Sequence, residues 1–315
     1  MAYTSTTVLP PAVQESLNLT ILSTPTPEYI YKMPALKEYM PRHGGDTMRF
    51  RRFVALNSFK VPLGGTGVTP PPSSLTATDL DATIDWYGDW IELNEQVVLQ
   101  NQESVLQNAA LRLGDALRKT EDELISAMLS ASATHVNAVN GGNGDVPTEI
   151  TAEDNDIITT SLVNANGHMF LSGIAGEDRY GTSPVRKAYI AMVNSASIPD
   201  LQRMDDFISV SAYPAQEYVM DGEWGAVNNA RFFVSSIAPS TASASANANT
   251  VYEVAYVAKE AYGVIEQRGG EARFIYHPAH LNGPLELSVT AATKFAQVPR
   301  LLNDAWCQIL DITLA

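Results

Sequence analysis

Clustered carboxylates come nearest in this sequence to a site for chemistry. Residues 136–178 include no Lys or Arg but carry seven acids: Asp145, Glu149, Glu153, Asp154, Asp156, Glu177 and Asp178. Hard cations bind clustered carboxylates, so a divalent-ion site is one interpretation. The alternative is a helix over residues 151–164, because Thr151 and Asp154 have capping spacing and acids favour a helix N-terminus. We favour the helix.

The other reactive side chains lack the partners that a site requires. His277 and His280 are spaced like metal ligands, but Pro278 disfavours a shared helical face and no third ligand is evident nearby. Cys307 lies in the apolar segment 306–312, where a thiol is more often a small core residue than a nucleophile. The sequence therefore predicts no catalytic residue and no bound metal.

Glycine-rich stretches do not predict a nucleotide site either. Gly64, Gly65 and Gly67 lead into prolines, and not into the helix whose N-terminus would bind phosphate. Residues 141–145 resemble a calcium-binding repeat, but the motif occurs once and its Asp stands one place early, so we interpret it as a turn. We expect no cofactor and no enzymatic activity.

Composition narrows the class of protein. The chain has 315 residues, 45% of them hydrophobic and 17% charged, so it can bury a substantial core. Its net charge of −15 opposes binding to the phosphates of DNA. A single cysteine cannot form an internal disulfide, which fits assembly in a bacterial cytoplasm. No apolar run approaches the roughly 18 residues of a membrane span, so we expect no membrane contact.

Residues 1–46 are predicted to form an extended arm. They include six prolines, and X-Pro steps disfavour helix. Tyr29, Tyr31 and Tyr39 help to make the segment too apolar for a solvated tail. We therefore expect the arm to lie on another surface, without a partner in its own chain, and we regard the three tyrosines as candidate assembly contacts.

Residues 47–92 are predicted to form a long hairpin, with strands at 47–61 and 76–93. The tip at 62–72 is too rich in Gly and Pro for a helix or a central strand. On the return strand Leu80, Ala82, Ile84 and Trp86 share one face, as in a half-covered strand. Cross-strand ion pairs are expected, and a ribbon this thin needs a neighbour to lie on. Its charged candidates for assembly contacts are Arg49, Arg51, Arg52, Lys60, Asp79, Asp81 and Asp85.

A helical period follows the hairpin at residues 104–130, where apolar side chains recur every three, four or seven residues. Thr120 and Glu123 have capping-box spacing, so two consecutive helices are an alternative to one. Beyond this region the pattern predicts strands at 187–194, 231–237, 251–258, 272–276, 285–291 and 306–314. A short helix is expected at Pro199 and a flexible loop at 238–250.

Aromatic residues gather beside glycines at residues 86–90 and 222–225. Such clusters can form stacking platforms for sugars or bases. Because no basic residues adjoin them, we interpret Trp86, Trp90 and Trp224 as packing anchors or interface contacts.

Taken in order, these segments resemble the major capsid proteins of tailed phages with the Hong Kong 97-type fold, and within them the N-four-like phage family. The resemblance is carried by residues 87–91 (YGDWI), 187–193 (KAYIAMV), 199–201 (PDL), 221–225 (DGEWG), 231–233 (RFF), 252–263 and 301–304 (LLND). It covers the chain from about residue 47 to the C-terminus. The order of the motifs matters more than any single match.

The resemblance implies an α+β fold with five parts. Residues 1–46 would be the N-terminal arm and 47–92 an extended loop that reaches over a neighbouring subunit. Residues 93–135 would form a peripheral domain with a spine helix, and 136–285 would be mainly the axial domain. Residues 286–315 would return to the peripheral domain.

The same resemblance implies a structural function without enzymatic activity. The subunit would self-assemble into hexamers and pentamers of an icosahedral virion shell, which encloses double-stranded DNA without specific binding. No long charged helical segment precedes the arm, so we expect a separate scaffolding protein, together with a portal and in some shells a decoration protein. We assign no residue pair to covalent crosslinking. The alternatives are an encapsulin-like compartment and an acidic metal-dependent hydrolase or binding protein.

Overall fold

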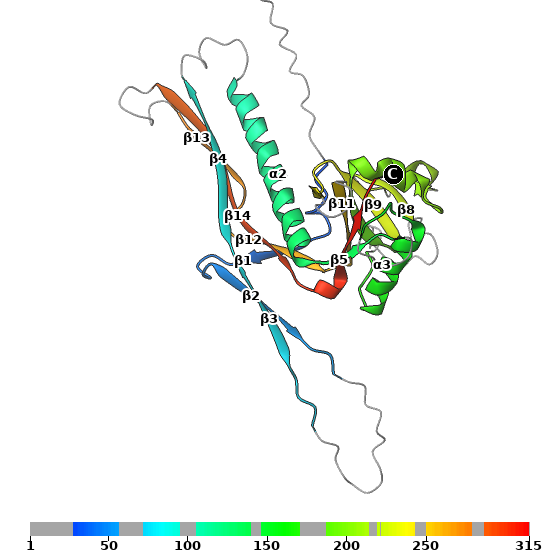
Figure 1. Ribbon diagram of the computed structural model, residues 1–315. Coiled ribbons are helices and arrows are strands. Elements are labelled where there is room, and N and C mark those ends of the chain that lie inside the picture. The colour runs from blue at the N-terminus through cyan, green and yellow to red at the C-terminus, as the bar shows by residue number, and fades with distance from the viewer. Residues whose placement is uncertain are drawn as a thin grey trace, which may run out of the picture.

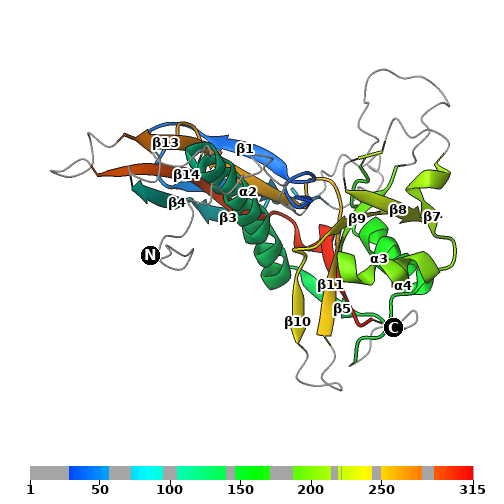
Figure 2. The same ribbon diagram turned by 90° about the horizontal axis from the view of Figure 1, so that it is seen from above.

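Two sheets and one long helix make up the body of the protein (Figure 1). The computed structural model describes residues 28–56, 72–94, 105–139, 146–170, 187–213, 219–220, 222–242, 250–278 and 287–314. Within these residues, one sheet lies beside the long helix, a second sheet forms a separate lobe, and a two-stranded ribbon projects from the body. Figure 2 shows the helix lying across the first sheet, with the lobe to one side.

The first sheet is covered by one long helix. Its described strands follow the order β1 (Leu36–Met40), β12 (Tyr262–Gln267), β14 (Ser288–Leu301) and β13 (Arg273–His277), and β4 (Asp85–Asn94) also pairs with β14. Helix α2 (Val105–Ser132) packs on β14 and β4. The predicted helix at 104–130 is confirmed from its first described residue. The alternative of two helices is wrong, because Thr120 donates to the Ala116 carbonyl inside a continuous helix.

The second sheet holds the larger core. Its described strands follow the order β5 (Thr134–Asn137), β15 (Cys307–Ile312), β11 (Thr250–Val257), β6 (Tyr189–Asn194), β9 (Ala230–Ser235), β8 (Glu223–Val227) and β7 (Ile208–Ser209), and β10 (Ser240–Ala242) also pairs with β11. Every residue of β6 is buried, because α3 (Ala152–Asn164) and α4 (Ile198–Arg203) pack on one face and α2 reaches the other. A strand covered on both faces reads as a continuous apolar run.

Most of the elements predicted beyond the long helix are confirmed, with shifted ends. Thr151 and Asp154 form the expected capping box at the start of α3, each accepting the backbone N–H of the other. The strand expected at 285–291 is longer, since β14 extends to Leu301. Six described strands were not predicted: β1, β5, β7, β8, β10 and β12. The first residues of the loop expected at 238–250 form β10, which pairs with β11. Residues 243–249 of the expected loop and residues 141–145 of the expected turn lie outside the described part.

The ribbon consists of β2 (Thr47–Phe53) and β3 (Ala77–Thr83), which pair antiparallel as predicted. Residues 57–71, including Lys60, lie outside the described part of the chain. The return strand does not stay in the ribbon. After Ile84 the chain continues as β4, which pairs with β14 along ten positions from Asn94 to Asp85. The ribbon is therefore anchored in the first sheet by its own continuation.

The arm was predicted to lack a partner within the chain, and this is wrong for residues 28–40. Strand β1 pairs in parallel with β12, from Leu36 opposite Gly263 to Met40 opposite Gln267. Ile30 and Tyr31 are buried in the core between α2 and the second sheet. Residues 1–27 lie outside the described part.

Sheet membership also differs from the expected domain boundaries. Strands β12 and β13 fall within 136–285 but belong to the sheet beside α2, whereas β15 falls within 286–315 but belongs to the other lobe. Along the described residues, no helix is long and apolar enough to cross a membrane.

Candidate assembly surfaces

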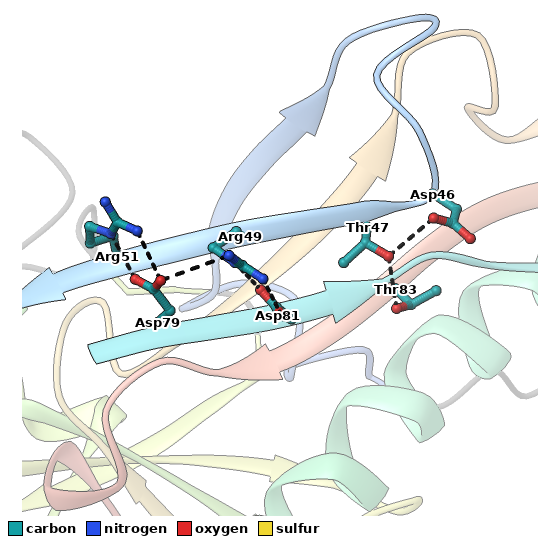
Figure 3. A network of polar contacts seen from close by, with 7 residues as sticks. All are labelled: Asp46, Thr47, Arg49, Arg51, Asp79, Asp81 and Thr83. Atoms are coloured by element: carbon teal, nitrogen blue, oxygen red, sulfur yellow. Dashed lines mark hydrogen bonds and ion pairs between the residues drawn. The ribbon is translucent and has the colours of Figure 1, made fainter. Parts of the chain in front are cut away.

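A ladder of ion pairs follows one face of the ribbon (Figure 3). Nε of Arg49 donates to Asp81 at 2.6 Å and Nη2 to the other carboxylate oxygen at 2.9 Å. Arg51 makes the same two-pronged contact with Asp79, at 2.7 and 2.9 Å. Thr47 and Thr83 continue the ladder through a hydroxyl contact of 3.2 Å. Each pair joins residues that face each other in the antiparallel register, as the sequence predicted.

These pairs fix the charge state of the ribbon. The hydrogen bond from Arg51 lowers the pKa of Asp79, and that from Arg49 lowers the pKa of Asp81. The same contacts raise the pKa of both guanidinium groups. All four side chains stay in solvent, so the ladder sets the register and stiffness of the ribbon more than the stability of the body.

The opposite face of the ribbon is apolar at its base. Ala82 and Ile84 are buried against Ile265 of β12 and Ala296 of β14, with Met48 and Phe50 packed beside them. Toward the outer end of the ribbon, on both of its faces, apolar side chains are exposed: Phe53 58%, Val54 50%, Leu56 50% and Leu75 64%. Phe53 follows Arg49 and Arg51 on the ladder side, and Arg52 is exposed on the other side. The ribbon therefore leaves the body with apolar surface that the described part of the chain does not cover.

Trp86 and Trp90 lie on the face of the first sheet that points away from α2. They stand opposite Ala296 and Ala292 of β14, whereas Thr293, next to Ala292, lines a groove with α2. The two indoles are 58% and 60% exposed, and Lys294 Nζ lies 5.7 Å from the Trp86 ring. Trp86 was predicted to continue the covered face of Ala82 and Ile84. In the structure the apolar cluster that buries Ala82 and Ile84 does not include Trp86, so the indole is exposed.

The candidate tyrosines of the arm have three different environments. Tyr31 is 1% exposed and packs inside its own chain, so it offers no surface to a neighbour. Tyr29 is half-buried, and its hydroxyl donates to the Asp115 carbonyl of α2 at 3.3 Å. Tyr39 is 47% exposed on β1. Asp85 is exposed at the start of β4.

Sequence reasoning missed Asp122, which holds the arm in place. Its carboxylate accepts the backbone N–H groups of Ile30, Tyr31 and Lys32 at 3.0, 3.0 and 3.2 Å. Burial raises the pKa of this carboxyl to about 6, and the three N–H donors act in the opposite direction. The sequence does carry one sign of this role, because Asp122 lies in the apolar stripe of the helix. A buried charge requires hydrogen-bond partners, so an acid at such a position indicates a contact with another segment.

Trp224 lies beside a buried ion pair that the sequence did not indicate. The indole is 39% exposed on β8, where the register with β9 shifts between Glu223 and Gly225. Glu223 accepts hydrogen bonds from Arg231 of β9, one of them at 2.7 Å, and from the Tyr213 hydroxyl at 3.0 Å. This pair explains why β8 and β9 each carry a buried charged residue.

The candidate sites for chemistry show structural environments instead. Asp154 caps α3, and Asp156 accepts a hydrogen bond from Asn228 at 2.7 Å. Glu149 and Glu153 are exposed, while Asp145, Glu177 and Asp178 lie outside the described residues. His277 is exposed, and His280 also lies outside. Across the described part of the chain, no three His, Cys, Asp or Glu side chains are grouped to hold a metal ion.

Cys307 is a core residue, as predicted. Its side chain is fully buried in β15, and burial raises the pKa of the thiol to about 12.

Comparison with known families identifies the class of protein. A family described as "Phage capsid protein" matches residues 77–298, which is more than half of the chain. The chain belongs to this family. The match begins at β3 and ends in β14, so it includes β3 of the ribbon, its continuation β4, helix α2 and most strands of both sheets. A search of curated proteins finds no match.

Solved capsids share the fold at low sequence identity. The structure of Mycobacterium phage Che8 is 13% identical, with a TM-score of 0.64, and the match covers 95% of this chain and 97% of that one. The capsid of cyanophage P-SCSP1u is 12% identical, with a TM-score of 0.67 over 100% and 96%. The capsid of Ralstonia phage GP4 is 12% identical, with a TM-score of 0.68 over 91% and 89%.

Family and fold together confirm the main prediction. The chain is the structural major capsid protein of a tailed phage, with the α+β Hong Kong 97-type fold, and it resides in the virion shell. It self-assembles into a capsid and is not an enzyme. The family match does not favour the encapsulin-like compartment, the hydrolase or the ion-dependent binding protein.

Proposed function

We propose that this capsid protein is the shell-forming subunit of an N-four-like phage, arranged in hexamers and pentamers around double-stranded DNA. The observation that carries the arrangement is the ribbon β2–β3, a stiffened projection whose outer apolar residues are left exposed by the described part of their own chain. A two-stranded ribbon is at best marginally stable alone in water. A neighbouring subunit supplies the missing cover.

The first sheet offers a matching surface for that neighbour. Trp86 and Trp90 form an exposed aromatic floor on the face away from α2, and exposed aromatic residues in a patch often become the centre of an interface. In this proposal the outer apolar residues of one ribbon cover the aromatic floor of the next subunit. Arg52 and Asp85 contribute polar contacts at the rim of the same interface.

We assign the domains by sheet membership. The peripheral domain comprises α2 with β1, β4, β12, β13 and β14, and the extended loop is the ribbon with its tip. The axial domain comprises the second sheet with α3 and α4, and it gathers around the five- and six-fold positions. Trp224 and Tyr39 are then exposed candidates for contacts of the axial domain and of the peripheral edge, respectively.

The proposal also covers the contents of the shell and the proteins that take part in its assembly. A chain with a net charge of −15 encloses DNA without binding its phosphates tightly, so the packaged genome can move along the inner wall. Individually weak contacts that close cooperatively allow wrong contacts to dissociate during assembly. A separate scaffolding protein directs that assembly, a portal occupies one vertex, and a decoration protein is an optional addition.

Purified protein, with its scaffolding protein where assembly requires one, tests this proposal by electron microscopy. Closed shells are expected. Monomers or small rings under every condition would contradict the proposal. Arg51→Glu should reduce shell yield severalfold and leave the melting temperature of the monomer nearly unchanged. Arg112→Glu is the matched control, because Arg112 is an equally exposed arginine, paired with Asp115 on α2. Equal loss of folding and assembly in Arg51→Glu would show that the ribbon is part of the core.

A further inference from the structure

Three successive backbone N–H groups of the arm converge on one carboxylate of α2. Ile30 donates to Oδ2 of Asp122, and Tyr31 and Lys32 both donate to Oδ1. Consecutive N–H groups that point to one place form a concave anion-binding site, or nest. Here the anion comes from the same chain, 90 or more positions later in the sequence.

The surroundings fix this contact from every side. Asp122, Ile30 and Tyr31 are each at most 2% exposed. The Tyr31 carbonyl accepts a hydrogen bond from the Tyr262 hydroxyl at 2.5 Å. Nζ of Lys32 lies 3.0 Å from Glu121 and 2.8 Å from Glu266, so this side chain joins α2 to β12. The arm thus has one register on the body at residues 30–32.

The chemistry of the nest requires a carboxylate at this position. Two acceptor oxygens serve three donors, whereas an asparagine would have one oxygen and would turn an NH₂ group toward an N–H. The nearby acids Glu121 and Glu266 share Lys32, so Asp122 is held by backbone N–H groups and not by a cation of its own. Removal of the carboxylate leaves three buried donors without this acceptor, which is costly.

We propose that Asp122 is the positioning residue of the N-terminal arm: by filling the nest of residues 30–32 it fixes the register of the arm on the body at these residues. The inference rests on the proposed function, in which the arm contributes to contacts between subunits. It assigns no contact to the arm itself. It assigns the point from which the arm can reach a neighbour.

Tryptic cleavage after Lys32 in the unassembled protein tests the inference, with formate as the probe anion. Asp122→Ala opens the nest, so cleavage should accelerate at least about tenfold, as expected when buried hydrogen bonds to a charged group are lost. Formate should restore protection in Asp122→Ala when compared with chloride at equal ionic strength, because it carries the same carboxylate. Glu121→Ala is the control, since it removes a neighbouring carboxylate that contacts only the Lys32 side chain among the arm residues, and formate should not affect it.

Several results would overturn the inference. Cleavage of Asp122→Ala at the wild-type rate would show that the carboxylate does not hold the arm. Faster cleavage that formate does not slow, or that it slows equally in Glu121→Ala, would reduce Asp122 to a packing residue. If Asp122→Ala fails to fold, Asp122→Asn replaces it, and cleavage at the wild-type rate in that variant has the same meaning. Shell yield is measured separately. If a variant with a released arm forms normal shells, the arm has no role in assembly, but the inference that Asp122 holds the arm still stands.

Discussion

The imidazole of His135 links Asp311 of β15 to the end of the spine helix. Its Nδ1 lies 3.0 Å from a carboxylate oxygen of Asp311, and its Nε2 lies 2.8 Å from the carbonyl oxygen of Ser130. The Ser130 carbonyl and an ionised Asp311 are both acceptors, so the protonated imidazolium, which donates from both ring nitrogens, satisfies both contacts. Helix α2 has no basic residue in its last turn, and a cation here also complements the helix dipole.

The first prediction is a pH dependence that His135 confers. Burial acts to lower the pKa of His135, but the Ser130 carbonyl and the charge of Asp311 outweigh it, so the pKa lies above its ordinary value. A raised folded-state pKa gives stability that is fully present below about pH 6.5 and is lost as the pH rises through the folded pKa. Glu253 on β11 also faces the ring and acts in the same direction.

His135→Gln should therefore be less stable than the wild type at pH 6 and nearly equal to it well above the folded pKa. The expected difference is at most about 1 kcal/mol, since the imidazole is partly exposed and solvent screens it. Melting temperatures of the unassembled protein across this range measure the effect. His277→Gln, an exposed histidine at the end of β13, is the control. Stability curves of wild type and His135→Gln that run parallel at all pH values would contradict the prediction.

The second prediction concerns the exchange of charges in the ribbon. Arg49→Asp alone places two carboxylates opposite each other in the register and should lower shell yield. Arg49→Asp combined with Asp81→Arg restores an ion pair in the same register and should recover most of that yield, because geometry and charge are both kept. Sedimentation of assembly reactions measures the yield. Failure of the double variant to exceed the single one would mean that Arg49 contacts a neighbour directly.

The ladder and the arm differ in how far the sequence could predict them. Arg49, Arg51, Asp79 and Asp81 were predictable, because pairing in an antiparallel hairpin follows from a period of two and from opposite charges on adjacent strands. The nest at Asp122 was not. The nest joins residues about 90 positions apart. The helical pattern can show that a polar residue such as Asp122 lies in the apolar stripe, but it cannot show which distant backbone N–H groups that residue contacts.

The strands were missed for a similar physical reason. Strand β12 has buried residues on both faces, so its sequence shows no alternation. Burial does alternate along β1, but its sequence hides this, because Glu38 lies on the inward side and Tyr39 is exposed. Sheet membership does not follow sequence order, because the chain crosses between the sheets repeatedly, from α2 to β5, from β11 to β12 and from β14 to β15. Sheet membership is a tertiary property.

The third prediction concerns the buried pair Glu223 and Arg231, whose side chains are 0% and 5% exposed. Glu223→Ala should reduce the free energy of unfolding by about 3–5 kcal/mol, because it removes the carboxylate that compensates a buried guanidinium. Glu223→Leu with Arg231→Met should lose much less, since no charge then remains buried. Urea unfolding of the unassembled protein measures both. Equal losses in the single and the double variant would contradict this explanation.

The fourth prediction compares two glycines, one in a crowded strand and one on an open face of a helix. A Cβ at Gly225 of β8 would lie 2.7 Å from the Ile208 carbonyl oxygen and would also collide with the Phe207 ring, so Gly225→Ala should separate β7 from β8. A Cβ at Gly114 of α2 meets nothing within 4 Å among the described atoms. Because alanine is the better helix former, Gly114→Ala should raise stability by up to about 1 kcal/mol. Thermal unfolding of the two variants should therefore shift in opposite directions, and a loss of stability in Gly114→Ala would mean that a neighbouring subunit approaches the helix backbone at that point.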